Sequence, residues 1–298
     1  MTEVATGKMC CVPAKILITS IAEKQELLFV PCGHRSVYQI YRFNCRKFPC
    51  RREIGWTLTL IGSSKVKMAE ETDLQHLLQN ADQLFDENQY QEAIDLLKKF
   101  PNQSDANILW REARALFKLS GTNKAKKEES IREGYELIQK ALELDENNYA
   151  CHKWMAVLLD AKSELDGIKV RVGQLANVKK HMQKAVDLNS EDPTNWHLLG
   201  NFAFGLADMP WYQRKIVSAI FATPPTGTYE EALDYFLKAE EKKANFYSMN
   251  LLFIGKCYYN MKNNEKAKEF ITRAANVQVV NEDDKKCKEE ATALLKKL

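Results

Sequence analysis

A spacing of small and large apolar residues recurs along the chain between residues 81 and 274. A small residue is followed 12 positions later by another, then after 4 positions by a large apolar residue and after 3 by a further apolar one. These intervals occur uninterrupted in Ala81, Ala93, Leu97 and Phe100 and in Gly255, Ala267, Ile271 and Ala274. Antiparallel helices need small residues where their backbones approach to about 8–10 Å. The spacing therefore predicts packed helical hairpins.

Three further copies of the pattern carry insertions of about nine, ten and 20 residues between their two halves. Their marker residues are Ala113, Gly134, Ile138 and Ala141; Ala156 and Ala185; and Trp196, Leu199, Gly200, Tyr229, Ala232, Phe236 and Ala239. Residues 141–148 and 185–192 are near copies of one turn. Five units in register predict an all-α, tetratricopeptide-like α-solenoid of about five helical hairpins. Polar residues 282–298 are expected to form its C-terminal capping helix.

The chain divides near residue 68 in both pattern and charge. Residues 1–67 hold 11 Lys/Arg and 4 Asp/Glu, a net charge of +7, whereas residues 68–298 hold 32 and 36, a net charge of −4. Short β-leaning runs occupy the first part, at Lys15–Ile21, Leu27–Val30, Ser36–Phe43 and Trp56–Ile61. They are too few to predict a sheet domain. Because Met68-Ala-Glu-Glu-Thr72 resembles a chain start, we interpret residues 1–67 as an atypical basic N-terminal extension, poorly ordered or small and β-leaning, and residues 68–298 as the helical array.

The sequence lacks the motifs of the common catalytic and transport classes. It contains no G-x-x-x-x-G-K-[ST], G-x-G-x-x-G or H-E-x-x-H motif. No run approaches the ~18–20 apolar residues of a membrane span, and the start has no signal-peptide pattern. Reduced thiols in an intracellular protein are therefore expected. A zinc site at Cys32, His34, Cys45 and Cys50 is the alternative, but their spacing differs from that of usual structural sites. We expect no enzyme activity, cofactor or metal.

The first helix of each hairpin is expected to face the concave groove of the array. With the helices oriented in this way, the binding candidates are Trp110, Arg114, Lys153, His197, Asn201, Phe204 and Tyr259. Aromatic and charged groups together suit an extended peptide or an amphipathic helix. The alternative is that several of them are ordinary helix-surface residues, or core residues in the case of His197.

The insertion of the fourth unit supplies four more candidates, Trp211, Tyr212, Arg214 and Lys215. Further along, Ile216, Val217, Ile220 and Phe221 space as one apolar helical face. Such a helix either covers the array or lines a groove or a partner surface. Both interpretations remain open at the level of sequence.

Several segments together closely resemble the regulator of microtubule dynamics family, over roughly residues 74–298. They are Met209-Pro-Trp-Tyr-Gln-Arg214, Phe221-Ala-Thr-Pro-Pro225, Thr228-Tyr-Glu230, His152-Lys-Trp154, Gly167-Ile-Lys169 and Asn245-Phe-Tyr-Ser248. The resemblance implies binding to microtubules and action at the mitotic spindle. It also implies that some members carry N-terminal membrane or mitochondrial sequences, and that a relative tethers organelles and binds phospholipid. Without a convincing N-terminal membrane helix, the chain is similar to the soluble, spindle-associated type.

We therefore expect a non-enzymatic microtubule-associated scaffold acting in spindle organisation and chromosome segregation. Its expected partners are microtubules or tubulin and other spindle or cytoskeletal proteins, and its expected location is the cytoplasm, cytoskeleton, spindle and spindle poles. The alternative is a phospholipid-binding or organelle-tethering module with mitochondrial association. The −4 charge of the array argues against nucleic acid. Candidate contacts with acidic tubulin are the basic clusters Lys124/Lys126/Lys127, Lys169/Arg171, Lys179/Lys180/Lys184, Arg214/Lys215 and Lys262/Lys266/Lys268.

Overall fold

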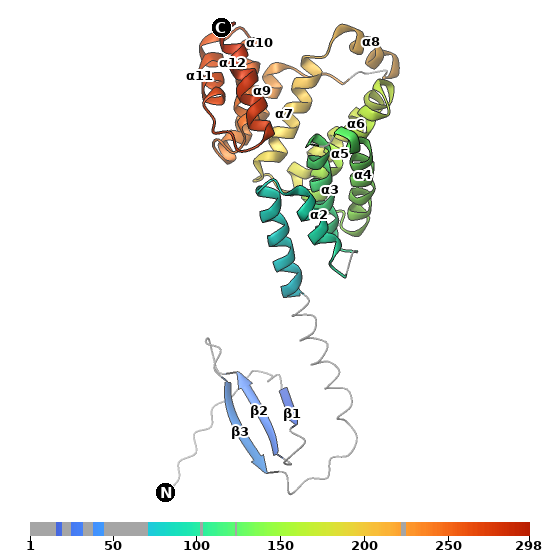
Figure 1. Cartoon of the computed structure of the whole chain (residues 1–298), viewed down its shortest axis with the longest axis vertical. Coiled ribbons are helices and arrows are strands. Elements are labelled where there is room, and N and C mark those ends of the chain that lie inside the picture. The colour runs from blue at the N-terminus through green and yellow to red at the C-terminus, as the bar shows by residue number, and fades with distance from the viewer. Residues whose placement is uncertain are drawn as a thin grey trace, which may run out of the picture. The chain divides into compact units, whose positions relative to one another are not determined.

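The computed structural model divides the chain into two compact units, Met1–Ala69 and Glu70–Leu298 (Figure 1). It describes residues 16–19, 25–31, 38–44, 71–101, 104–122, 124–221 and 225–298. The first unit contains a three-stranded antiparallel sheet of β1 (Ile16–Thr19), β2 (Gln25–Pro31) and β3 (Tyr38–Asn44), in that order. Its strands fall on three of the four β-leaning runs, each paired with the next run along the chain. The fourth run, Trp56–Ile61, and the zinc-site alternative lie outside the described residues.

The second unit is built from helices throughout the residues described. It begins with a helix over residues 71–86. Then follow α2 (Tyr90–Lys98), α3 (Ala106–Thr122), a 3-10 turn η1 (Lys124–Lys126), α4 (Lys127–Leu144), α5 (Tyr149–Leu165), α6 (Ile168–Leu188), α7 (Pro193–Ala207), α8 (Trp211–Ile220), α9 (Tyr229–Lys242), α10 (Ser248–Asn260), α11 (Asn264–Ala275) and α12 (Glu282–Leu295). None of the described helices is both long and apolar enough to cross a bilayer.

The described helices pair into five hairpins followed by a cap (Figure 1). Residues 71–86 pack with α2, α3 with α4, α5 with α6, α7 with α9, and α10 with α11, while α12 packs on α10 and α11. The predicted all-α, tetratricopeptide-like fold is confirmed. The three insertions take different forms: the second and third hairpins simply have longer helices of 17 to 21 residues, whereas the fourth contains the extra helix α8.

Close helix packing explains the spacing of small residues. A Cβ added at Gly200 would lie 2.6 Å from the ring of Phe236, and one added at Gly255 would lie 2.4 Å from Ile271. The small residue of each first helix therefore accommodates the large apolar residue of the second. The remaining markers of the pattern with 0% exposure are Leu97, Ala113, Ile138, Ala141, Ala156, Ala185, Ala232, Ala239, Ala267 and Ala274.

Short polar side chains fix where the helices begin. Asn148 and Asp192 each accept a hydrogen bond from the backbone N–H two residues later, at 3.0 and 2.9 Å. The side chains of Thr228, Asn263 and Asn281 accept from the backbone N–H three residues later, at the starts of α9, α11 and α12. Each cap satisfies a backbone donor that the helix cannot, which stabilises it by about 0.5–2 kcal/mol. The two near-identical turns thus start the third and fourth hairpins in the same register.

Candidate functional site

A cavity of about 1190 Å³ is lined in large part by the first helices of consecutive hairpins, and we call the side that it occupies the inner side of the array. Its wall comes from residues 85–90, the ends of α3, α5 and α7, the starts of α4 and α6, the turn before α8, and the segment that leads into α12. Part of the wall is apolar, with Val172, Leu175 and Phe202, and part is charged, with Asp160 and Arg171. Arg171 and Asp160 neutralise each other at 2.8 Å. The cavity is large enough for a small-molecule ligand.

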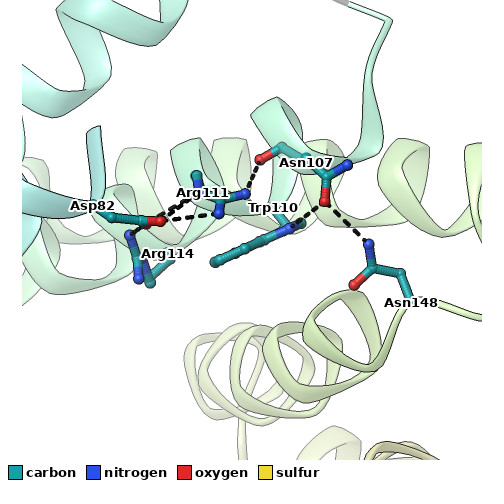
Figure 2. A network of polar contacts seen from close by, with 6 residues as sticks. All are labelled: Asp82, Asn107, Trp110, Arg111, Arg114 and Asn148. Atoms are coloured by element: carbon teal, nitrogen blue, oxygen red, sulfur yellow. Dashed lines mark hydrogen bonds and ion pairs between the residues drawn. The ribbon is translucent and has the colours of Figure 1, made fainter. Parts of the chain in front are cut away.

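A polar network lies near the start of α3 (Figure 2), next to the cavity, since its Arg114 contacts Phe85 of the cavity wall. Asp82 accepts hydrogen bonds from Arg111 at 2.9 Å and from Arg114 at 2.6 Å. The Arg114 guanidinium lies 3.8 Å from the ring centre of Phe85, and that of Arg111 lies 4.2 Å from the ring centre of Trp110. Burial lowers the pKa of Arg114, although the charge of Asp82 opposes the shift. Two cations thus share one carboxylate, which leaves a fixed positive charge.

Asn107 extends this network to the next hairpin (Figure 2). Its side-chain oxygen accepts from Trp110 Nε1 and from Asn148 Nδ2, both at 3.4 Å. Its backbone oxygen accepts from Arg111 at 3.1 Å. The same side chain of Asn148 caps α5. The network therefore couples the inner surface directly to the turns that set the register of the hairpins.

Lys153 ties the third hairpin to the fourth. Its ammonium lies 2.7 Å from Asp192, and both side chains are largely buried. Burial alone would raise the pKa of Asp192, but the charge and hydrogen bond of Lys153 and the hydrogen bonds from Thr194 together outweigh burial and lower that pKa. Lys153, predicted as a groove residue, is thus engaged in an ion pair within the chain.

His197 lies in the core and not at a groove surface. Its Nδ1 is 2.9 Å from Asn250 Oδ1 and its Nε2 is 2.9 Å from Asn201 Nδ2. Since one contact needs a donor and the other an acceptor, the imidazole is neutral, and burial lowers its pKa to about 4. Asn201 lines the cavity.

Phe204 and Tyr259 also fall away from the groove position predicted for them. Phe204 is buried against the rings of Tyr229 and Phe253, at 5.4 and 5.1 Å between centres. Tyr259 is half-buried against the C-terminal core. Phe204 belongs to the apolar contact between the fourth and fifth hairpins and Tyr259 packs on the C-terminal core, so both contribute packing where the sequence predicted a binding surface.

The insertion helix α8 presents its candidate residues outward. Trp211 is 70% exposed and Tyr212 is 52% exposed. The Lys215 ammonium lies 4.9 Å from the ring centre of Trp211. Arg214 donates to the backbone oxygens of Ala207 and Met209, at 2.9 and 2.8 Å, and so fixes the turn between α7 and α8. Of the predicted apolar face, Val217 is buried while Ile220 is exposed.

The sequence did not single out several residues that shape the inner surface. Arg111 completes the network around Asp82, and Lys118 pairs with Asp283 across the array. Helical spacing held a signal for both, since Arg111 follows Asn107, and Lys118 follows Arg114, by one turn. Their partners come from other hairpins and could not be read from spacing.

The described residues offer binding groups more than reactive ones. They contain no cluster of three or more His, Cys, Asp or Glu suited to a metal ion. Burial raises the pKa of the Cys151 and Cys257 thiols to about 12, so neither is a thiolate nucleophile at neutral pH. Cys287 is likewise buried, with a raised pKa. The chemistry that these side chains offer is that of charge pairing and aromatic contact.

Solved structures with this fold include a thermophilic TPR (tetratricopeptide repeat) protein from Thermus thermophilus. Its similarity has a TM-score of 0.53 at 13% identity and covers 74% of this chain and 98% of that one. At this identity the likeness concerns the fold alone. It agrees with the hairpin array described above.

Sequence comparison is more specific. Residues 77–298 match the family described as "Regulator of microtubule dynamics protein 1-3". Regulator of microtubule dynamics protein 1 of Bos taurus is 39% identical over 227 residues, which cover 75% of this chain and 72% of the relative. Protein 2 of Bos taurus is 31% identical, with 74% and 55% covered, and protein 3 of Rattus norvegicus is 34% identical, with 71% and 46% covered. The chain therefore belongs to the regulator of microtubule dynamics family.

Proposed function

We propose that this protein is a non-enzymatic microtubule-associated scaffold, working in the cytoplasm at the spindle and its poles in spindle organisation and chromosome segregation. The observation that carries the proposal is the match of residues 77–298 to a family described by its regulation of microtubule dynamics. An array of hairpins with a pre-ordered inner surface supports a role in binding, because such arrays present extended surfaces to partners.

Exposed cations on α6 support contact with an acidic surface such as that of tubulin. Lys180 and Lys184 lie one turn apart on the exposed side of the helix. Neither has a carboxylate partner within the part of the chain that the structure describes. Lys179, their neighbour, lies 3.8 Å from Glu231. The unpaired side chains leave a positive stripe that attracts acidic partners and weakens with salt.

Co-sedimentation of the full chain with taxol-stabilised microtubules tests the proposal. We expect the chain to pellet with microtubules and to be released as salt rises from ~0.05 to ~0.3 M. The double variant Lys180→Glu/Lys184→Glu should bind several-fold more weakly. Lys288→Glu/Lys297→Glu changes the net charge equally on the exposed surface of the C-terminal cap and is the matched control. A chain that stays in the supernatant at low salt contradicts the proposed function.

A second candidate function, binding of a single phospholipid, is favoured by the cavity. The apolar part of the wall, which includes Val172, Leu175 and Phe202, could hold acyl chains. Lys127, Lys285 and Lys286 line the same space, have no ion pair among the described residues, and carry the charge that a phosphate group needs. Native mass spectrometry of the purified chain tests this: a bound lipid supports it, and Phe202→Asp should abolish the adduct. A chain that carries no lipid after incubation with phosphatidic acid contradicts it.

A further inference from the structure

Exposed apolar side chains concentrate at one place on the helical unit. Nine large apolar side chains are exposed among the residues that the structure describes. Five of them lie on α8 or on the first three residues of α6, namely Trp211, Tyr212, Ile220, Ile168 and Val170. These two helices contact each other, and residues of both, among them Ile168 and Gln213, line the cavity. We call these five residues the α6–α8 patch. A concentration of this kind marks an interaction surface.

The patch faces outward because α8 is held from its inner side. Val217 is buried beneath the helix, and Arg214 fastens its first turn to the backbone oxygens of Ala207 and Met209. Asp208, in the same turn, accepts a hydrogen bond from Tyr229 at 2.9 Å. The indole of Trp211 is therefore exposed on a helix that is packed against the unit. Its exposure does not come from a detached helix.

The charges within the patch are all positive. Lys169 lies between Ile168 and Val170, and Arg214 and Lys215 follow Tyr212. No acidic residue occurs in 168–170 or 211–220. Asp166, close by in sequence, is paired with Arg132 at 2.9 Å and Lys162 at 2.6 Å. Since residues 68–298 carry −4 overall, an anionic surface attracts this patch and repels much of the remaining unit, which gives the contact an orientation.

The combination of rings and cations fits a membrane surface. Tryptophan and tyrosine favour the boundary between lipid headgroups and acyl chains, because an amphipathic ring satisfies both sides. Lysine and arginine beside them attract anionic headgroups. An acidic protein groove would pair the cations, but it would also need pockets that match five apolar side chains of different shapes. A lipid surface accepts side chains of any shape. We propose that the α6–α8 patch docks the protein reversibly on anionic phospholipid membranes.

The proposal does not depend on microtubule binding or on a lipid inside the cavity. It concerns the outer surface of an intact bilayer, whereas the cavity would hold a single molecule. With only two aromatic rings and three cations, the contact is expected to be weak and dependent on salt. Docking would place the rim of the cavity next to the membrane.

Flotation of the full chain with vesicles tests the proposal. We expect about tenfold more binding to phosphatidylcholine vesicles containing about 30% phosphatidylserine than to phosphatidylcholine alone. Trp211→Ser/Tyr212→Ser should lose most of that binding, and Lys169→Glu/Lys215→Glu should lose the preference for anionic lipid. The matched control, Leu144→Ser/Leu237→Ser, removes two apolar side chains that are 51% and 37% exposed elsewhere on the unit. It should bind as the unmodified chain does.

Unchanged thermal midpoints will show that each variant is folded, as expected for exposed positions. Equal flotation with neutral and anionic vesicles, or unchanged binding of Trp211→Ser/Tyr212→Ser, would overturn the proposal. The same variants are measured with microtubules in parallel. If Trp211→Ser/Tyr212→Ser loses microtubule binding while flotation is absent for every protein, the patch is a protein-docking surface and membrane docking is refuted.

Discussion

The ammonium of Lys118 on α3 lies 2.6 Å from the carboxylate of Asp283 on α12, across 165 positions of the sequence. Tyr247 donates a hydrogen bond to the same carboxylate oxygen at 3.1 Å. All three residues line the cavity. In an open solenoid each repeat touches only its neighbours, whereas here the C-terminal cap contacts the second hairpin. The array therefore closes on itself at the cavity.

Asp283→Asn should loosen this closure while keeping an acceptor for Tyr247. Burial alone would raise the pKa of Asp283, but the hydrogen bond and charge of Lys118, the hydrogen bond from Tyr247 and the charge of Lys286 together hold it below its usual range, so the carboxylate is charged at neutral pH. Both charged side chains are somewhat less than one-third exposed. We expect a loss of about 0.5–2 kcal/mol in the free energy of unfolding and faster amide exchange in residues 282–295. Asp234→Asn breaks the exposed Lys238 pair on α9 and is the control. Equal exchange in both variants would contradict the closure.

Gly255→Ala should destabilise the fifth hairpin, whereas Gly205→Ala should not. The new methyl group at 255 would lie 2.4 Å from Ile271, while nothing lies within 4 Å of that at 205. Overpacking is expected to cost about 1–3 kcal/mol. Gly205 is exposed on α7, where alanine should gain about 0.5–1 kcal/mol by helix propensity. Urea unfolding of both variants measures the difference, and equal effects would mean that close helix approach does not explain the glycine.

The hairpins could be predicted from the sequence because the contacts that form them lie within each hairpin. Gly200 and Phe236, or Gly255 and Ile271, meet because backbone contact demands a small residue opposite a large one. That demand repeats in every unit, so spacing alone reveals it. The capping turns at Asn148 and Asp192 are equally local.

The surface residues were harder to predict because their surroundings come from other hairpins. Asn201 and Phe204 lie less than one turn apart on α7, yet Asn201 lines the cavity and Phe204 packs on Phe253 of α10. A small rotation of α7 about its axis therefore decides which of the two side chains faces the cavity and which is packed in the core. The Lys118–Asp283 pair forms only because of how all the intervening hairpins are rotated relative to one another. No local sequence pattern predicts that rotation.

Mild acid should destabilise the helical unit through His181 and His197. Burial lowers the pKa of each to about 4, and for His181 the charge of the neighbouring His152 adds to the shift. Between pH 6.5 and 4 the unfolded chain binds protons that the folded chain does not, so stability falls as pH falls through this range. We expect a loss of about 2–3 kcal/mol for each histidine by pH 4. Urea unfolding at intervals from pH 7 to 4 measures it.

Replacing one histidine measures how much that residue contributes to the pH dependence of stability. His181 Nδ1 lies 2.9 Å from His152 Nδ1, while His152 Nε2 lies 2.8 Å from a backbone oxygen. His152 must donate to that oxygen, so in its neutral form it accepts from His181. His181→Gln should therefore flatten the pH dependence of stability between pH 6.5 and 4. His76→Gln, at an exposed position, should leave it unchanged. Equal slopes in the two variants would exclude the buried pair as its source.

Asp82→Ala should destabilise the first two hairpins by leaving two cations against each other. Arg111 and Arg114 are only 15% and 14% exposed, so water cannot fully replace the lost carboxylate. Asp82 itself is 37% exposed, which places the expected cost near the lower part of about 1–3 kcal/mol.

A double-mutant cycle separates this repulsion from simple loss of packing. If Asp82 chiefly offsets the two guanidinium charges, Asp82→Ala/Arg111→Gln should cost less than the sum of the single changes, by about 0.5–2 kcal/mol. The same cycle on Asp234 and Lys238, which are 62% and 42% exposed, should give less than about 0.5 kcal/mol. Coupling of equal size in the two cycles would mean that burial does not strengthen the network around Asp82. A larger value there would show that the positive charge of the inner surface is held in place by a single carboxylate.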